Sequence, residues 1–198
     1  TNLIGEALLA GLPGLDVLDI GGGFPVTYQD EMMPIGEFCA PIRAALAKVP
    51  AHVRLIAEPG RFISAPAGTA VSTVMGKAKR DGRWWYYLDD GVYGSYSGQM
   101  FDHAKYPVDS LRTEGPRFPS VLAGPTCDSI DVIDDNILLP ELEVGDLVVG
   151  RVMGAYTWAS ATDFNFFRRA KVVVMNEGPA VEGRVVRLER KSGKRTGA

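Results

Sequence analysis

Cysteine and histidine are scarce in this chain of 198 residues. The two cysteines, Cys39 and Cys127, form no CxxC pair and are too few for a disulfide framework, which argues against a structural zinc site. The two histidines, His52 and His103, have no second histidine or acid at the spacing of metal ligands. We therefore predict that the chain holds no metal.

A surplus of positive charge is also missing. Lysine and arginine total 21 residues against 24 aspartates and glutamates, which gives a formal net charge of -3. An electrostatic nucleic-acid binder would need a basic surplus. No apolar run approaches the roughly 18 residues of a membrane span. We therefore expect the chain to bind neither nucleic acid nor a membrane.

The first third of the chain alternates helix and strand. The pattern predicts a helix over residues 1–10, a strand over 15–20, a helix over 35–49 and a buried strand over 53–57. Strand, helix and strand in this order form a βαβ unit, whose strands should be parallel neighbours. About 60 residues cannot close a (β/α)8 barrel, which needs roughly 250. We therefore expect further sequence before Thr1.

After about residue 66 the pattern changes to β-strands. Two β-rich segments, 69–79 and 84–88, flank Asp81-Gly82, a two-residue hairpin signal. No long helical pattern follows, so this half predicts an antiparallel β barrel or sandwich. The boundary divides the chain into residues 1–66 and 67–198. Further strands are expected over residues 120–123, 146–152, 170–175 and 185–188.

Two turns that follow the predicted parallel strands are candidates for binding an anionic ligand. In Gly21-Gly22-Gly23 no Cβ blocks the approach of an anion to the backbone N–H groups, although a turn that merely needs positive φ is the alternative. Glu58-Pro59-Gly60-Arg61 should lie on the same rim of the sheet. There Arg61 could face an anion and Glu58 a basic nitrogen, the alternative being a local salt bridge.

Five further residues admit both a functional and a structural interpretation. Cys127 lies between a Gly-Pro turn and Asp128, where we expect it on an exposed loop, although a free cysteine is more often buried. Asp128 and Asp131 could be ordinary solvated loop acids. Tyr93 could shape a loop around a ligand or pack in a turn. Tyr156 could donate a hydrogen bond to an anion or fill the core.

Taken in order, six blocks of the sequence resemble the fold type III, pyridoxal-phosphate-dependent amino-acid decarboxylases, most closely the ornithine/lysine decarboxylase group. Together they span nearly the whole chain, which makes them far more specific than any one block. The blocks are Gly21-Gly22-Gly23-Phe24-Pro25, Glu58-Pro59-Gly60-Arg61, Asp89-Asp90-Gly91-Val92-Tyr93-Gly94, Phe101-Asp102-His103-Ala104, Gly124-Pro125-Thr126-Cys127-Asp128 and Gly154-Ala155-Tyr156-Thr157.

The resemblance implies a fold class of α/β plus all-β. The chain would hold the C-terminal remnant of an alanine-racemase-like (β/α)8 barrel, followed by a β-barrel or sandwich domain. It also implies pyridoxal 5'-phosphate as the cofactor, and Glu58 would pair with its pyridine nitrogen. The residues that the resemblance places on the cofactor are Gly22, Gly23, Glu58, Gly60, Arg61 and Tyr156.

By the same resemblance, Cys127 and Glu58 would be catalytic, with Cys127 assisting protonation of the carbanion left when CO2 departs. Asp102 and Asp128 would hold the distal ammonium of a diamino acid, because two acids complement a chain-end cation. Tyr93 and Phe164 would also lie near the substrate. The reaction would be decarboxylation of L-ornithine or L-lysine to a diamine, in cytoplasmic polyamine biosynthesis.

Cys-Asp rather than Cys-Glu-Ser follows the Gly-Pro-Thr, which departs from the diaminopimelate decarboxylase pattern and favours a basic substrate. Ornithine and lysine differ by one methylene, worth only about 1–3 kcal/mol in a pocket, so the choice between them stays open. Family sites lie between subunits, and the Cys127–Asp128 loop would reach into the partner's site. A symmetric homodimer with shared active sites is implied.

Two expected residues have no match in the chain. The family's Schiff-base lysine belongs to an early barrel strand, as does its stacking histidine, and both are expected before Thr1. We therefore expect this chain alone to be inactive. The alternatives are a non-catalytic regulatory paralogue and a Cys-dependent hydrolase, for which His103 is the only candidate base of the β domain. The lysines without a matching context are Lys48, Lys77, Lys79, Lys105, Lys171, Lys191 and Lys194.

Overall fold

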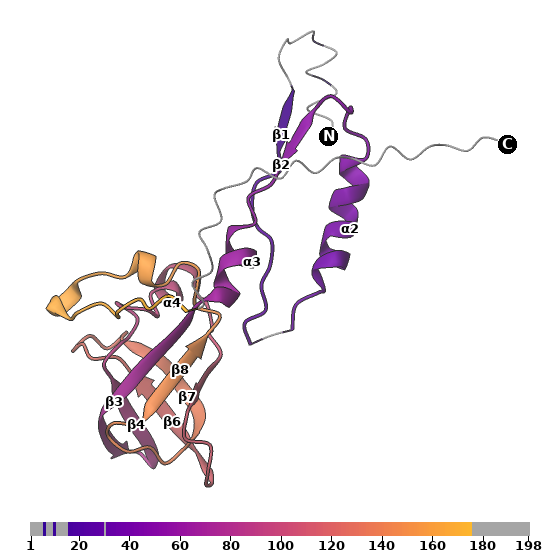
Figure 1. Ribbon diagram of the computed structural model, residues 1–198. Coiled ribbons are helices and arrows are strands. Elements are labelled where there is room, and N and C mark those ends of the chain that lie inside the picture. Colours follow the sequence, from indigo (N-terminus) through magenta and orange to yellow (C-terminus); the bar gives the residue numbers. More distant parts are fainter. Residues whose placement is uncertain (1–5, 7–9, 11–15, 30, 176–198) are drawn as a thin grey trace.

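The computed structural model describes residues 6, 10, 16–29 and 31–175. Within them a small α/β part at the amino-terminal end adjoins a larger β domain, and the short helix α3 (Gly60–Ser64) lies where the two meet (Figure 1). The predicted helix over 1–10 and strand over 185–188 fall largely or wholly outside the described residues. No described helix is long and apolar enough to cross a membrane.

The α/β part is the predicted βαβ unit. Strand β1 (Val17–Asp19) pairs in parallel with β2 (Arg54–Ile56), and α2 (Ile35–Leu46) connects them. Both strands are shorter than predicted and half exposed rather than buried; the side chain of Val17 is 39% exposed. Parallel strands are buried only where helices cover both faces of their sheet, and the described residues supply a single crossover helix.

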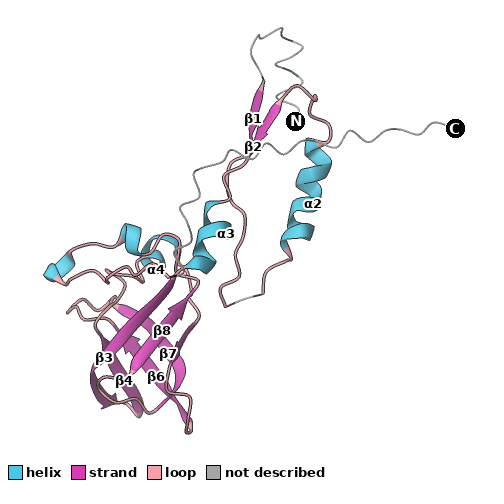
Figure 2. Ribbon diagram, viewed as in Figure 1, coloured by secondary structure: helices cyan, strands magenta, loops and turns pink. Residues whose placement is uncertain are grey.

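The β domain is one sheet of six strands in the order β5-β8-β3-β4-β6-β7. Figure 2 labels β3, β4, β6, β7 and β8 of this sheet. Its end strands β5 and β7 come into contact, so the sheet is nearly a closed barrel. Neighbouring strands are antiparallel as predicted, except that β4 and β6 run parallel. The strands are β3 (Thr69–Arg80), β4 (Arg83–Leu88), β5 (Val108–Ser110), β6 (Arg117–Ala123), β7 (Val132–Pro140) and β8 (Leu147–Arg151).

The parallel pair has a topological cause. The connection from β4 to β6 is long and contains α4 (Gly98–Asp102) and β5, so the chain returns to the same end of the sheet before β6 begins. By contrast β3 and β4 form the predicted hairpin, with positive φ at both Asp81 (50°) and Gly82 (78°), as a type I′ turn requires. The carboxyl ends of β4 and β6 therefore lie at one edge of the sheet.

One predicted strand is wrong and two strands were not predicted. Residues 170–175 pair with no strand among the described residues, and their valines stay exposed. Strand β5 is short, and β7 carries Asp134-Asp135-Asn136 in its middle, which has the composition of a loop. Pairing with β6 along its length makes β7 a strand despite this polar run.

Side chains on the inward face of β4 pack in the core of the β domain. Tyr86 and Leu88 are fully buried and alternate with outward residues, as the period of a strand requires. The Tyr86 hydroxyl accepts a hydrogen bond of 3.0 Å from the backbone N–H of Leu142. Tyr87 is different, because its buried hydroxyl has no hydrogen-bond partner among the described residues.

These two tyrosines give a matched test of the core. We expect Tyr86→Phe to lower the free energy of unfolding by about 1–3 kcal/mol, because the buried Leu142 N–H loses its acceptor. We expect Tyr87→Phe to change it by less than about 0.5 kcal/mol, because no described bond is lost. Urea unfolding of the two variants measures both changes, and equal changes would contradict this assignment.

Candidate functional site

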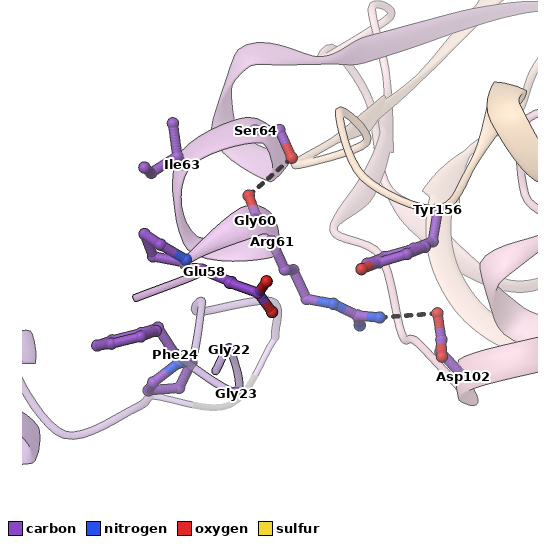
Figure 3. Close-up of a pocket in the computed structure, with 12 residues that line it drawn as sticks. Gly22, Gly23, Phe24, Glu58, Gly60, Arg61, Ile63, Ser64, Asp102 and Tyr156 are labelled. Carbon is purple, nitrogen blue, oxygen red and sulfur yellow. Dashed lines mark hydrogen bonds and ion pairs between the residues drawn. The ribbon is translucent and has the colours of Figure 1, made fainter. Parts of the chain in front are cut away.

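The two turns that follow β1 and β2 meet at one cavity of about 1050 Å3 (Figure 3). All six residues predicted to bind the cofactor line it, and so does Asp102. The side chains of Glu58, Arg61 and Tyr156 therefore reach one shared space, as the sequence predicts. None of the lysines in the described part of the chain lines this cavity.

Parallel pairing is what joins the two turns. Beyond the ends of the strands, the backbone N–H of Glu58 donates to the carbonyl of Gly21 at 2.9 Å. Gly21 and Gly23 have φ of 69° and 81°, which glycine adopts at little cost. At Gly22 a Cβ would come within 2.8 Å of the Glu58 carbonyl oxygen. The glycine cluster thus permits both the positive φ and the close approach of the second turn.

Arg61 follows that turn in the first helical turn of α3, and its guanidinium points across the cavity. Its Nη2 lies 2.7 Å from Oδ2 of Asp102, and its Cζ lies 4.8 Å from the centre of the Tyr156 ring. Burial disfavours the charged guanidinium, but the hydrogen bond and charge of Asp102 outweigh it and raise the pKa of Arg61. Glu58 is therefore accompanied in this cavity by a cation that stays protonated.

Tyr156 is held at the cavity by backbone packing behind it. The backbone N–H groups of Met153 and Gly154 donate to the carbonyls of Gly68 and Ala65, each at 2.9 Å. A Cβ at Gly68 would collide with the backbone of Gly154, so only glycine allows this approach. The Tyr156 side chain is 55% exposed, which contradicts the interpretation that it fills the core.

The other predicted site residues form a second group. The Tyr93 hydroxyl donates a hydrogen bond of 2.5 Å to Oδ2 of Asp128, and the Tyr93 ring stacks on Phe164 with centroids 4.2 Å apart. Cys127 is exposed, as expected of a loop cysteine, and accepts a weak hydrogen bond from Asn165 at 3.5 Å. None of these residues lines the first cavity.

The hydrogen bond between Tyr93 and Asp128 changes the acidity of both. Donation to a carboxylate stabilises the neutral phenol, and together with burial this raises the pKa of Tyr93 to about 12. The same bond stabilises the ionised carboxylate and lowers the pKa of Asp128. Asp128 therefore stays negatively charged at neutral pH, as a residue that binds an ammonium group must.

Two acids make contacts that the sequence did not predict. Asp102, expected to face a substrate ammonium, is paired with Arg61. Asp131 is not a solvated loop acid, because its side chain accepts three hydrogen bonds and the residue is 2% exposed. His103 is exposed and makes no hydrogen bond to Cys127 in the described structure, so nothing there supports a Cys–His hydrolase.

The model of the pyridoxal-dependent decarboxylase C-terminal sheet domain matches residues 17–154, which include both groups of residues apart from Tyr156 and Phe164. The chain belongs to the pyridoxal-dependent decarboxylase family. The sequence resemblance is thus confirmed, as is a nearly closed β-sheet domain.

Two relatives in this decarboxylase family are named as decarboxylases of basic amino acids. The lysine/ornithine decarboxylase of Selenomonas ruminantium is 37% identical over 169 residues, which are 85% of this chain and 43% of that protein. The ornithine decarboxylase of Caenorhabditis elegans is 37% identical over 182 residues, covering 82% of this chain and 42% of its own. The chain thus spans less than half the length of these relatives.

Solved structures in the decarboxylase family share the fold. A lysine/ornithine decarboxylase from Vibrio vulnificus, complexed with cadaverine, is 60% identical with a TM-score of 0.86 and covers 89% of this chain and 48% of its own. The putrescine complex of the Vibrio vulnificus enzyme is 59% identical with a TM-score of 0.84, over 88% of this chain and 48% of that one. A structure of SrLDC with PLP and cadaverine is 38% identical, with a TM-score of 0.79, over 85% and 44%.

The cofactor of this decarboxylase family is pyridoxal phosphate. The chemistry of the cavity fits such a group. A glycine turn without side chains and the Arg61 guanidinium can bind a phosphate, and the Glu58 carboxylate can accept a hydrogen bond from a protonated ring nitrogen. No cluster of three metal-ligating side chains occurs among the residues that the structure describes.

Proposed function

We propose that this chain is the C-terminal portion of a pyridoxal-phosphate-dependent decarboxylase that converts L-ornithine or L-lysine to a diamine, a reaction of polyamine biosynthesis. Residues 1–66 would complete a (β/α)8 barrel, and residues 67–198 would form its β domain. The observation that carries the proposal is that Glu58, Arg61 and Tyr156 converge on one cavity. Membership of the decarboxylase family supports it.

The proposed roles at the cavity follow from charge and hydrogen bonding. Arg61, the Tyr156 hydroxyl and the backbone N–H groups of the Gly22-Gly23 turn would bind the cofactor phosphate. The Glu58 carboxylate would keep the ring nitrogen protonated. When bound, pyridoxal phosphate would supply an electron sink for the carbanion that forms as CO2 leaves. The chain's own part is to orient that ring and maintain its charge.

The substrate end of the proposal rests on two acids. Asp102 and Asp128 would share the distal ammonium of the diamino acid, and Asp128 is ionised because Tyr93 donates to it. Asp102 would also hold Arg61 in place, as it does in the structure. The relatives bound to cadaverine and putrescine support a diamine product. One methylene separates ornithine from lysine, so we include both.

We also propose that the active form is a homodimer with shared sites. Cys127, Asp128, Tyr93 and Phe164 do not line the cavity that Arg61 and Glu58 line, although the chemistry needs a proton donor near the reacting carbon. A two-fold axis would place the Cys127–Asp128 loop of each chain at the cavity of its partner. This arrangement gives both groups of residues a role in one reaction.

A catalytic lysine would come from a preceding portion of the protein, so we propose that this chain alone is inactive. The competing proposal is a non-catalytic regulatory paralogue. The presence of Glu58, Arg61, Cys127, Asp128 and Tyr156 together weighs against it, because a protein without catalysis has no use for both an electron-sink partner and a proton donor.

Decarboxylation by the complete protein tests the proposal. We expect CO2 release from ornithine, lysine or both in the presence of pyridoxal phosphate, and none from residues 1–198 alone. The measurement is release of labelled CO2, with the absorbance of added pyridoxal phosphate as a separate assay of cofactor binding. Cofactor binding without CO2 release from either diamino acid would favour the regulatory paralogue. The absence of both cofactor binding and CO2 release would overturn the proposal.

The role of Cys127 gives a second prediction. We expect Cys127→Ala to lower the rate of diamine formation by about 10²–10⁴-fold, the usual contribution of a positioned proton donor, with unchanged affinity for pyridoxal phosphate. The matched control is Cys39→Ala on α2, outside both groups, which should leave the rate unchanged. Loss of cofactor binding in Cys127→Ala would show that the assigned role is wrong.

A further inference from the structure

A buried carboxylate lies beneath the loop that carries Cys127. Asp131, just before β7, is 2% exposed and has no ion-pair partner among the described residues. Its Oδ1 accepts the backbone N–H of Val92 at 2.9 Å. Its Oδ2 accepts the N–H and the hydroxyl of Thr126 at 3.0 and 2.7 Å. Three protein donors therefore replace the hydrogen bonds that the carboxylate would make with water if it were exposed.

Two glycines leave the space that this carboxylate fills. A Cβ at Gly91 or at Gly124 would collide with the Asp131 carboxylate, so neither position admits a larger residue while the carboxylate is there. Gly91 belongs to the loop after β4, and Gly124 belongs to the loop after β6. The Asp131 side chain is thus packed between two loops that meet because β4 and β6 run parallel.

The hydrogen bonds of Asp131 extend to the residues proposed to act on the substrate. The Thr126 hydroxyl that donates to Asp131 also accepts the backbone N–H of Asp128 at 3.4 Å. The Asp131 N–H donates to the Asp128 carbonyl at 3.0 Å. On the other loop, Val92 directly precedes Tyr93, whose hydroxyl donates to the Asp128 carboxylate. One buried acid thereby fixes both ends of the Tyr93–Asp128 hydrogen bond.

We propose that Asp131 is a positioning residue that holds the Cys127–Asp128 loop against the Tyr93 loop through Thr126 and Val92. Cys127 lies on a short loop and is not held by packing of its own side chain, since it is exposed. Residues that act on a substrate need support from a rigid layer behind them. The carboxylate of Asp131 supplies it by joining two backbones that no strand pairing joins at that point.

The proposal rests on the proposed function for its catalytic consequence, but its structural consequence is tested separately. In the complete protein with bound pyridoxal phosphate, Asp131→Asn replaces an acceptor oxygen by an amide nitrogen that faces N–H donors. We expect the Tyr93–Asp128 bond to weaken and the pKa of Tyr93, raised to about 12 by that bond, to fall toward 10. NMR of tyrosines labelled at the ring carbon, assigned with Tyr93→Phe, measures it.

The kinetic consequence separates positioning from general stability. We expect Asp131→Asn to raise the substrate KM about tenfold or more, as for a weakened bond to a charged group, and to lower the fraction of turnovers that yield the diamine. Affinity for pyridoxal phosphate should not change, because Asp131 does not line the Arg61 cavity. The matched control is Asp135→Asn, an exposed acid on β7, the strand that Asp131 precedes, and it should change none of these values.

A second pair of variants tests the contact if Asp131→Asn does not fold. Thr126→Val removes the hydroxyl between Asp131 and Asp128, and Thr126→Ser retains it. We expect the valine variant to lower the Tyr93 pKa and raise KM, and the serine variant to resemble the wild type. Unchanged Tyr93 pKa and KM in the folded variants would overturn the proposal. A wild type that releases no CO2 would overturn the proposed function instead, while the Tyr93 titration would still decide the role of Asp131.

Discussion

Parallel pairing between strands that are distant in the sequence brings together the residues of both groups of predicted site residues. The pair β1–β2 brings the glycine turn and the Glu58–Arg61 turn to one edge. In the β domain the pair β4–β6 does the same for the loops that carry Tyr93 and Cys127. Since carboxyl ends of parallel strands share an edge, each pair collects chemical groups that local structure alone would leave apart.

Features encoded locally could be predicted from the sequence. The βαβ unit follows from apolar periodicity, and the hairpin follows from Asp81-Gly82 with its two positive φ angles. The glycine turn and the Glu58–Arg61 turn could be placed together because each directly follows a predicted parallel strand, so their shared edge required only the parallel rule. Tyr156 was assigned to the same site only through the family resemblance, and the structure shows that it lines the same cavity.

Features that depend on long-range pairing or on competing partners could not be predicted from the sequence. The strand β7 has a polar middle, and only its pairing with β6 makes it a strand. The burial of Asp131 depends on two glycines in other loops, and a lone acid after a turn has the same local pattern when it is solvated. The ion pair of Asp102 with Arg61 joins α4 to α3, which nothing in either motif specifies. The valines of 170–175 have strand composition without a described partner strand.

We propose that each active site combines the Arg61 cavity of one subunit with the Cys127 loop of its partner, because Cys127 does not line the Arg61 cavity of its own chain. Mixing two inactive variants of the complete protein, Arg61→Ala and Cys127→Ala, tests this most directly. Random reassembly gives half heterodimers, each with one intact site, so we expect recovery of about a quarter of wild-type activity. If the reassembled mixture is as inactive as its separate components, the claim is contradicted.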